Sequence, residues 1–112
     1  MIVEGDGYSV EFPDGDERAV LRGVMRLASA HAYEQAFAGL RAQVDMGRAL
    51  TIDLCGVQFM NSSGIRVLAG LVLRARDCGA ALRLVASARV PWQKKTITSL
   101  RTLDRGLAVD LC

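Results

Sequence analysis

The spacing of hydrophobic and polar residues changes along the chain and predicts strands and helices in turn. Apolar and polar side chains alternate over residues 8–12 and 19–26, which is typical of half-buried strands. The turn-forming sequence Pro13-Asp-Gly-Asp16 separates the two segments, so together they predict a β-hairpin. Shorter apolar segments at residues 50–54, 81–85 and 107–111 predict three further strands.

Three other segments repeat apolar residues every three or four positions, which is the pattern of amphipathic helices. The first lies between Ser29, a favoured N-cap residue, and Gly47, a favoured helix stop. The second starts near Ser63 and ends near Gly79. The third follows Pro91, and proline is well tolerated in the first turn of a helix.

The predicted order of elements is β-β-α-β-α-β-α-β, within one domain that spans residues 1–112. Strands that alternate with helices indicate an α/β fold, because a helical crossover returns the chain to a parallel neighbouring strand. The N-terminal hairpin adds an antiparallel pair, so the expected fold class is α/β with a mixed β-sheet and three main helices. With 51% hydrophobic residues, a chain of 112 residues can bury a core without a disulfide or a metal.

The residue inventory argues against an enzyme, a cofactor or a metal site. Cys55, Cys78 and Cys112 form no Cys-x-x-Cys pair, and the only histidine is His31, so the ligands of a zinc site are missing. We expect the three cysteines to be buried or free thiols in a reducing cytoplasm. A Ser-His-Asp triad is not expected either, because nothing brings His31 near Ser62.

The formal net charge of +2 is unevenly distributed. Residues 1–56 carry nine acidic and five basic side chains, whereas residues 57–112 carry three acidic and nine basic ones. The basic residues are scattered apart from Lys94-Lys95, and few aromatic residues accompany them, so no direct nucleic-acid binding is expected. The longest apolar run, at residues 67–73, is far shorter than the roughly 20 residues of a membrane span, so no span is expected.

The sequence Asn61-Ser-Ser-Gly64 carries the most distinctive chemistry. It lies between a predicted strand and a predicted helix, and Asn61, Ser62 and Ser63 all favour helix N-caps. The first turn of a helix has unpaired backbone N–H groups and partial positive charge, so an exposed hydroxyl here could carry a phosphate in a favourable field. Ordinary helix capping is the alternative interpretation of the same residues.

The strand Thr51-Ile-Asp-Leu54, the loop Val57-Gln-Phe-Met-Asn-Ser-Ser-Gly-Ile65 and the order of elements resemble the STAS domain, and in particular bacterial anti-sigma factor antagonists. The segment Val90-Pro-Trp-Gln-Lys-Lys95 resembles a subgroup of small stand-alone STAS regulators. The resemblance implies a STAS-like mixed sheet. It also implies a cytoplasmic, non-enzymatic protein of signal transduction that controls transcription by partner switching.

In that family, a serine kinase that doubles as an anti-sigma factor phosphorylates the first serine of an Asp-Ser-Ser-Gly motif. The kinase is of the histidine-kinase-like ATPase type, and a PP2C-type phosphatase resets the switch. Mapped onto this sequence, the resemblance implies phosphorylation of Ser62, with Ser63 as the second choice. Asn61 stands where the family has aspartate, and the missing carboxylate could either slow the kinase or reduce repulsion of the phosphate.

The expected partner-binding loop consists of five consecutive residues, Asn61, Ser62, Ser63, Gly64 and Ile65. Four further residues are candidates for the interface, namely Asp53, Met60, Trp92 and Lys94. Each of these four has a structural alternative. The alternatives are a tether at a strand end for Asp53, core packing for Met60, packing against the sheet edge for Trp92 and a solvated basic face for Lys94.

Two other functions are compatible with the sequence. A ligand- or nucleotide-sensing STAS module would use the same loop and helix N-terminus to hold a small anionic molecule. A constitutive scaffold or assembly subunit would bind its partner without phosphorylation. The sequence leaves the identity of the kinase, the target and the oligomeric state open.

Overall fold

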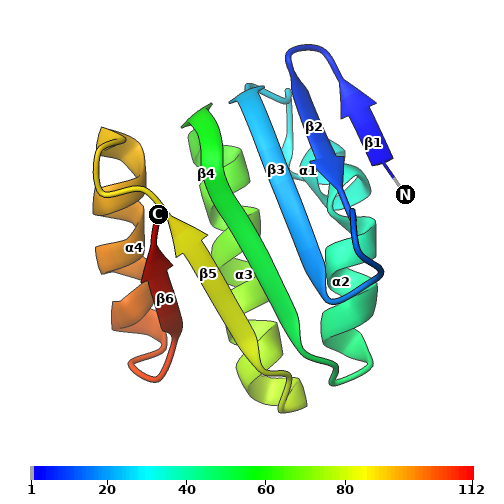
Figure 1. Ribbon diagram of the computed structural model, residues 1–112, viewed down its shortest axis with the longest axis vertical. Helices are drawn as coiled ribbons and strands as arrows, with labels where there is room; N and C mark the ends of the chain where they lie inside the picture. Colours follow the sequence, from blue (N-terminus) through cyan, green and yellow to red (C-terminus); the bar gives the residue numbers. More distant parts are fainter. Residues whose placement is uncertain (1) are drawn as a thin grey trace.

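The computed structural model describes residues 2–112, which form a six-stranded mixed β-sheet with helices packed on one face (Figure 1). The strands are β1 (Ile2–Gly5), β2 (Tyr8–Glu11), β3 (Arg18–Met25), β4 (Leu50–Met60), β5 (Leu82–Ala86) and β6 (Ala108–Leu111). The helices are α1 (Ala30–Ala36), α2 (Ala38–Asp45), α3 (Ser62–Cys78) and α4 (Pro91–Leu103). The α/β fold class and the mixed sheet expected from the sequence are therefore confirmed.

The strands lie in the sheet in the order in which they occur along the chain, from β1 to β6. The pairs β1–β2 and β2–β3 are antiparallel, and the three remaining pairs are parallel. One hydrophobic cluster fills the space between the sheet and the helices, with Leu21, Ile52, Leu68 and Leu84 at its centre and fully buried. The core therefore lies on one face of the sheet, which we call the helix face.

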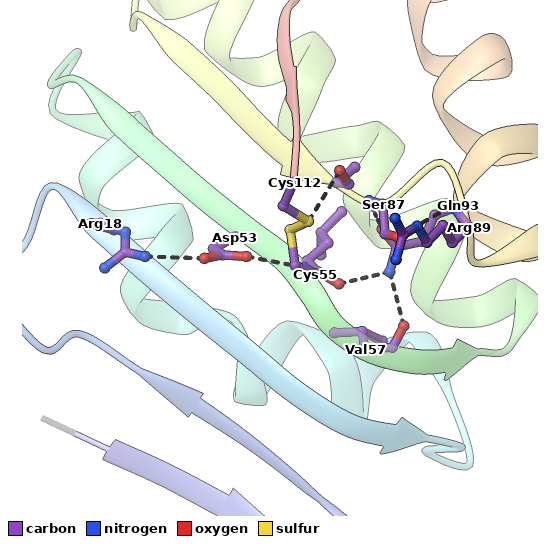
Figure 2. The surroundings of a disulfide bond; sticks show 10 residues. Arg18, Asp53, Cys55, Val57, Ser87, Arg89, Gln93 and Cys112 are labelled. Carbon is purple, nitrogen blue, oxygen red and sulfur yellow. Dashed lines mark hydrogen bonds and ion pairs between the residues drawn. A yellow bond between two sulfur atoms is a disulfide. The ribbon is translucent and has the colours of Figure 1, made fainter.

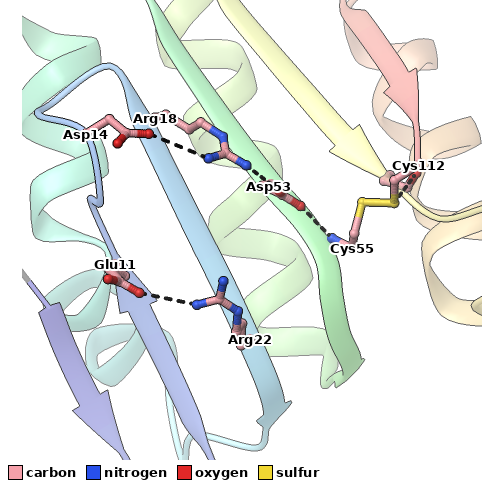
Figure 3. Close-up of polar contacts among 8 residues, drawn as sticks. Glu11, Asp14, Arg18, Arg22, Asp53, Cys55 and Cys112 are labelled. Carbon is pink, nitrogen blue, oxygen red and sulfur yellow. Dashed lines mark hydrogen bonds and ion pairs between the residues drawn. A yellow bond between two sulfur atoms is a disulfide. The ribbon is translucent and has the colours of Figure 1, made fainter.

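The opposite face, which we call the open face, has no helix on it and carries ion pairs between strands (Figure 3). Arg22 pairs with Glu11 across β2 and β3, and Arg18 pairs with Asp53 across β3 and β4. These pairs are largely exposed, so each contributes at most about 1 kcal/mol to stability. Their main effect is to keep the open face polar and the strands in register.

Two elements differ from the sequence prediction at the N-terminal end. The strand β1 was not predicted, and it pairs with β2 through the two-residue turn Asp6-Gly7. Gly7 adopts a φ of +82°, a left-handed conformation that glycine enters without steric cost, whereas Asp6 has no positive φ. The prediction of a single helix before Gly47 is wrong as well. The backbone angles of Phe37 (φ −98°, ψ 13°) are not helical, so the segment forms two helices, α1 and α2. The apolar spacing continues through Phe37, so periodicity alone does not reveal this break.

The predicted strand at residues 50–54 is too short, because β4 continues to Met60. The sequence indicates a loop from Gly56 onward, yet β3 keeps its pairing with this segment up to Met25↔Met60. Register shifts typical of β-bulges accommodate the turn-forming residues within the strand. Only Asn61 then separates β4 from α3, which makes the junction between strand and helix much tighter than expected.

Beyond Asp53, β4 diverges from β5, and the side chain of Gln93 fills the gap in hydrogen bonding. Gln93 is fully buried, and its Nε2 donates to the carbonyl oxygens of Leu54 at 2.7 Å and Val57 at 2.9 Å. Its Oε1 accepts from the backbone N–H of Ser87 at 2.8 Å (Figure 2). The Gln93 side chain thus replaces the backbone hydrogen bonds that are missing between the ends of β4 and β5. It also attaches the start of α4 to both strands.

We predict that Gln93→Leu lowers the free energy of unfolding by about 2–4 kcal/mol, because it leaves buried backbone groups without partners. Guanidinium chloride denaturation measures this change. The matched control is Gln35→Leu, since Gln35 is also helical but exposed, and we expect less than about 0.5 kcal/mol there. Equal stability of the two variants would contradict the role assigned to Gln93.

Candidate functional site

The carboxyl end of β4 leads directly into the N-terminus of α3. Asn61 is the N-cap of α3, and its Oδ1 accepts from the backbone N–H of Gly64 at 3.4 Å. Ser62 is therefore the first residue of a helix of 17 residues, and its side chain is exposed. Among the three residues that could cap this helix, Asn61 does so, which leaves the hydroxyl of Ser62 free.

The side-chain amide of Asn61 is fixed by three elements at once. The Tyr33 hydroxyl lies 2.6 Å from Asn61 Oδ1 and 2.9 Å from the Met25 carbonyl oxygen, so its single proton serves these two acceptors. Asn61 Nδ2 donates to the Leu27 carbonyl oxygen at 3.0 Å. This network joins the end of β3, helix α1 and the start of α3, and it determines which way the amide is oriented.

The phenol of Tyr33 is the buried anchor of this network. Its side chain is fully buried, and burial raises the pKa of Tyr33 above its usual value of 10.0. The neutral phenol is also the only form that can donate a proton to Asn61. Tyr33 was not identified from the sequence, because it fits the apolar stripe of α1 and its partner Asn61 lies 28 residues further along the chain.

Gly64 is buried directly beneath the Tyr33 ring. A Cβ at this position would lie 2.6 Å from Met60 Cγ and 2.6 Å from Tyr33 Cε1 and Cζ, which is closer than atoms can pack. The glycine therefore allows α3 to approach α1, and its lack of a side chain serves packing inside the protein.

The electrostatics around Ser62 favour an anion. The first turn of α3 contains no acidic residue, and the backbone N–H groups of Ser62 and Ser63 have no acceptor among residues 2–112. These N–H groups and the helix dipole together give a partially positive surface. Arg66 lies one turn further along α3 and is exposed, which adds a full positive charge on the same side of the helix.

An apolar and cationic patch flanks this helix start at the ends of β3 and β4. Phe59 is 38% exposed although it is a large hydrophobic residue, and Arg26 Cζ lies 5.1 Å from the centroid of its ring. Phe59 is opposite Val24 in the pairing of β3 with β4, two residues before Asn61. An exposed aromatic ring covered by an arginine is a common feature of protein-binding surfaces.

The other residues that the sequence singled out are distributed over the molecule. Met60 is 1% exposed and belongs to the core, so it presents no surface to a partner. Asp53 lies on the open face, where it accepts from Arg18 and from the backbone N–H of Cys55. Trp92 is half-buried and donates to the Val57 carbonyl oxygen, whereas Lys94 is exposed on α4.

Within the predicted loop itself, the five residues differ in exposure. Ser62 is exposed, Asn61, Ser63 and Ile65 are half-buried, and Gly64 is buried. Ile65 packs against the core cluster. The surface that a partner could reach therefore consists mainly of Ser62 together with the exposed parts of its neighbours.

The expectation of three free thiols is wrong for two of the cysteines. Cys55 on β4 and Cys112 after β6 form a disulfide, and their Cα atoms are 6.5 Å apart. They lie 57 residues apart in sequence, so only the order of strands β4, β5 and β6 in the sheet brings them together. Cys78 is free and half-buried.

Residues 2–112 contain no group of three or more His, Cys, Asp or Glu side chains that could hold a metal ion. None of their helices is long and apolar enough to cross a membrane.

The fold and the Asn61–Gly64 junction agree with what comparison with known proteins finds. A family model described as "Mlab, STAS domain" matches residues 9–104, and the chain therefore belongs to the STAS domain family. Residues 9–104 include both Ser62 and the Trp92-Gln93 pair. No curated protein matches the chain.

Two solved structures share the fold over nearly the whole chain. A chain in the crystal structure of the diguanylate cyclase SiaD in complex with its activator SiaC from Pseudomonas aeruginosa has a TM-score of 0.69 and 14% identity, over 99% of this chain and 97% of that one. An anti-sigma factor antagonist from Mycobacterium paratuberculosis has a TM-score of 0.57 and 24% identity, over 98% of this chain and 86% of that one. At these identities, the likeness establishes the fold and not the activity.

We predict that Gly64→Ala lowers the free energy of unfolding by about 1–3 kcal/mol, because the added methyl group overlaps the Tyr33 ring. Gly70→Ala is the matched control in the same helix, since a Cβ there meets nothing within 4 Å. The control should gain about 0.5–1 kcal/mol from the better helix propensity of alanine. Chemical denaturation of both variants tests this, and a gain for Gly64→Ala would refute the packing argument.

We also predict that the Tyr33 phenol makes the folded protein sensitive to alkaline pH. The unfolded chain releases this proton near pH 10.0 while the folded protein retains it, so the stabilisation is complete below that pH and is lost as the pH rises towards the folded pKa. Tyr33→Phe should remove this dependence, besides costing about 1–2 kcal/mol at neutral pH. Denaturation curves of the unaltered protein and of Tyr33→Phe across this range provide the measurement, and an unchanged pH dependence in Tyr33→Phe would contradict the prediction.

Proposed function

We propose that this STAS domain is a bacterial partner-switching regulator that is controlled by phosphorylation of Ser62. The observation that carries the proposal is the exposed Ser62 hydroxyl at the N-terminus of α3, beside an N-cap that leaves it free. The proposed partner is a serine kinase of the histidine-kinase-like ATPase type that also acts as an anti-sigma factor. A PP2C-type phosphatase would reset the switch.

The local field supports a phosphate on this hydroxyl. Two backbone N–H groups without acceptors and the nearby Arg66 favour an anion, so the modified helix start would be stable in the folded protein. A partner that docks on the same surface faces the opposite situation. A phosphate adds about −1.5 to −2 charges, which must lose water when the apolar part of an interface closes over them.

The replacement of aspartate by Asn61 fits its hydrogen bonds. Asn61 Nδ2 donates to the Leu27 carbonyl oxygen, and an aspartate would put a carboxylate oxygen there instead. The amide also adds no negative charge beside Ser62, so the surface stays partially positive before modification. Phosphorylation would therefore reverse the sign of the local charge, which gives a larger electrostatic contrast between the two states.

The fold relatives support a protein as the partner. One similar structure is an anti-sigma factor antagonist, and another contains an enzyme in complex with its activator. The exposed Phe59 ring with Arg26 above it offers a contact that such a partner could cover. The proposed regulator acts in the cytoplasm.

We predict that a phosphate on Ser62 weakens binding to the partner more than a hundredfold, which corresponds to about 3 kcal/mol. Ser62→Asp should weaken binding at least about tenfold, and Ser62→Ala should leave it intact. Intact-mass analysis of protein isolated from its native cells, followed by titration calorimetry with the partner that co-purifies, measures both steps. The matched control is Ser99→Asp, an exposed serine on α4 that should leave the affinity unchanged.

The outcomes separate the proposal from the constitutive scaffold. Equal affinity of Ser62→Asp and Ser62→Ala would sink the switch. A partner bound tightly by protein that never carries phosphate would identify a scaffold. A phosphate on Ser63 in place of Ser62 would move the switch by one residue, to a side chain that is already half-buried.

A groove between α1–α2 and α3 is a second candidate site, for a small ligand. Its volume is about 420 Å³, within the range of small-molecule sites, but its lining does not include the loop residues 61–65 that the sequence suggested for a ligand. Three arginines and the acidic Glu34 and Asp77 line it, and Arg41 and Arg74 are paired with Asp45, so Arg66 is the residue there that would hold an anion. A rise in melting temperature with nucleotides or anionic metabolites, lost in Arg66→Ala, would favour sensing over switching.

A further inference from the structure

The disulfide between Cys55 and Cys112 lies on the open face of the sheet, opposite the face that the helices cover (Figure 2). Cys112 follows β6, and the bond passes over the end of β5 to reach β4. The separation of the two Cα atoms, 6.5 Å, is within the range that a disulfide spans without backbone movement.

Backbone hydrogen bonds hold Cys112 at the end of β5 independently of the bond between the sulfur atoms, and the pairing of β4 with β5 ends at Asp53↔Val85, two residues before Cys55. The backbone N–H of Cys112 donates to the Ala86 carbonyl oxygen at 2.9 Å, and Leu111 is opposite Ala86 in the parallel pairing of β5 with β6. The ion pair between Arg83 and Asp110, at 2.8 Å, links the same two strands. The two thiols of the reduced protein would therefore be neighbours already, which favours closure of the bond.

The pair is also accessible, and its opening leaves no hole in the protein. Cys112 is exposed and Cys55 is half-buried, whereas the core cluster lies on the helix face. A small thiol can therefore reach the sulfur atoms without unfolding the chain. Exposed disulfides are more readily reduced than those sealed in a core, and they include the regulatory ones.

We propose that Cys55 and Cys112 form a reversible redox pair that exchanges with a small-molecule disulfide of the glutathione class. The Cys112 thiolate attacks oxidised glutathione, which forms a mixed disulfide and releases one glutathione thiolate. The Cys55 thiolate then attacks the Cys112 sulfur and releases the second. Two protein thiols and one oxidised glutathione thus yield one protein disulfide and two reduced glutathiones, and the two electrons pass from the cysteines to glutathione.

The closed pair changes the stability of the protein while leaving its surface at Ser62 in place. The bond links two residues that are 57 positions apart and encloses α3, β5, α4 and β6. A cross-link of this length restricts the unfolded chain, so the oxidised protein should melt roughly 10 °C or more above the reduced protein. Oxidation would therefore control how long the regulator survives and not which partner it binds.

The test equilibrates the full chain with defined ratios of reduced and oxidised glutathione, traps the thiols by alkylation and measures intact mass and melting temperature. We expect a transition between the dithiol and the intramolecular disulfide within this series, accompanied by the shift in melting temperature. Cys55→Ser and Cys112→Ser should melt like the reduced protein at every ratio. Cys78→Ser is the matched control and should behave like the unaltered chain.

Three results would overturn the proposal. In the first, both thiols stay free even in excess oxidised glutathione. In the second, the disulfide resists excess reduced glutathione until the protein is denatured, which would make it a permanent cross-link. In the third, the bond forms between two copies of the chain, which non-reducing electrophoresis detects as a dimer. Each readout is independent of phosphorylation, so the outcome does not depend on the function proposed for Ser62.

Discussion

The hydrogen bonds of the Asn61 side chain fix the part of the structure on which the candidate site depends. One amide accepts from Tyr33 and from the backbone of Gly64 and donates to the backbone of Leu27, so its polar atoms are occupied. Because Tyr33 is buried, this network ties the start of α3 to the core. The exposure of Ser62 follows from this constraint, since the neighbouring residue takes the capping role and the helix cannot rotate to bury the hydroxyl.

The same junction explains why the helix start is closely packed on one side and open on the other. Gly64 faces inward beneath the Tyr33 ring, where no larger residue fits. Ser62 faces outward, with two unpaired N–H groups of the helix backbone beside it. The backbone at this site is held rigidly, whereas the Ser62 side chain is exposed. Its charge could therefore change by modification without unfolding the protein.

A second constraint acts on the middle of β4, where the strand leaves β5. Gln93 supplies the missing hydrogen bonds from the helix face, and the disulfide at Cys55 joins the strand to Cys112 on the open face. The two devices differ in chemistry. Removal of the Gln93 amide would leave buried backbone groups of β4 and Ser87 without hydrogen-bond partners. Reduction of the disulfide would break no backbone hydrogen bond directly.

Much of this organisation could be predicted from the sequence, and the exceptions have physical reasons. Ser29, Gly47 and Pro91 mark helix ends by local chemistry, and they do so in the structure. Tyr33 and Gln93 each have a distant partner, Asn61 at 28 residues and Leu54 at 39 residues, so no local pattern identifies those partners, although a glutamine at the helical spacing of Ile97 and Leu100 is a signal.

The boundaries of β4 and the disulfide were missed for a related reason. Both depend on how the strands pair, and the spacing of apolar residues does not predict which strands pair or in which register. Gly56 and Gln58 interrupt the apolar pattern and are typical of a loop. The bulges that keep them in β4 depend on its pairing with β3, which the local sequence does not show. The candidate site at Ser62, in contrast, is marked by a motif that is continuous in sequence.

The order of the strands in the sheet has a consequence for how the molecule forms. Each strand pairs only with those immediately before and after it in the chain, so no strand needs to insert between two that are already joined. The sheet can therefore grow from one edge while the polypeptide is still being synthesised, with modest loop closures at every step. The last strand, β6, is also the one that brings Cys112 beside Cys55, so the native position of this pair depends on the completed sheet.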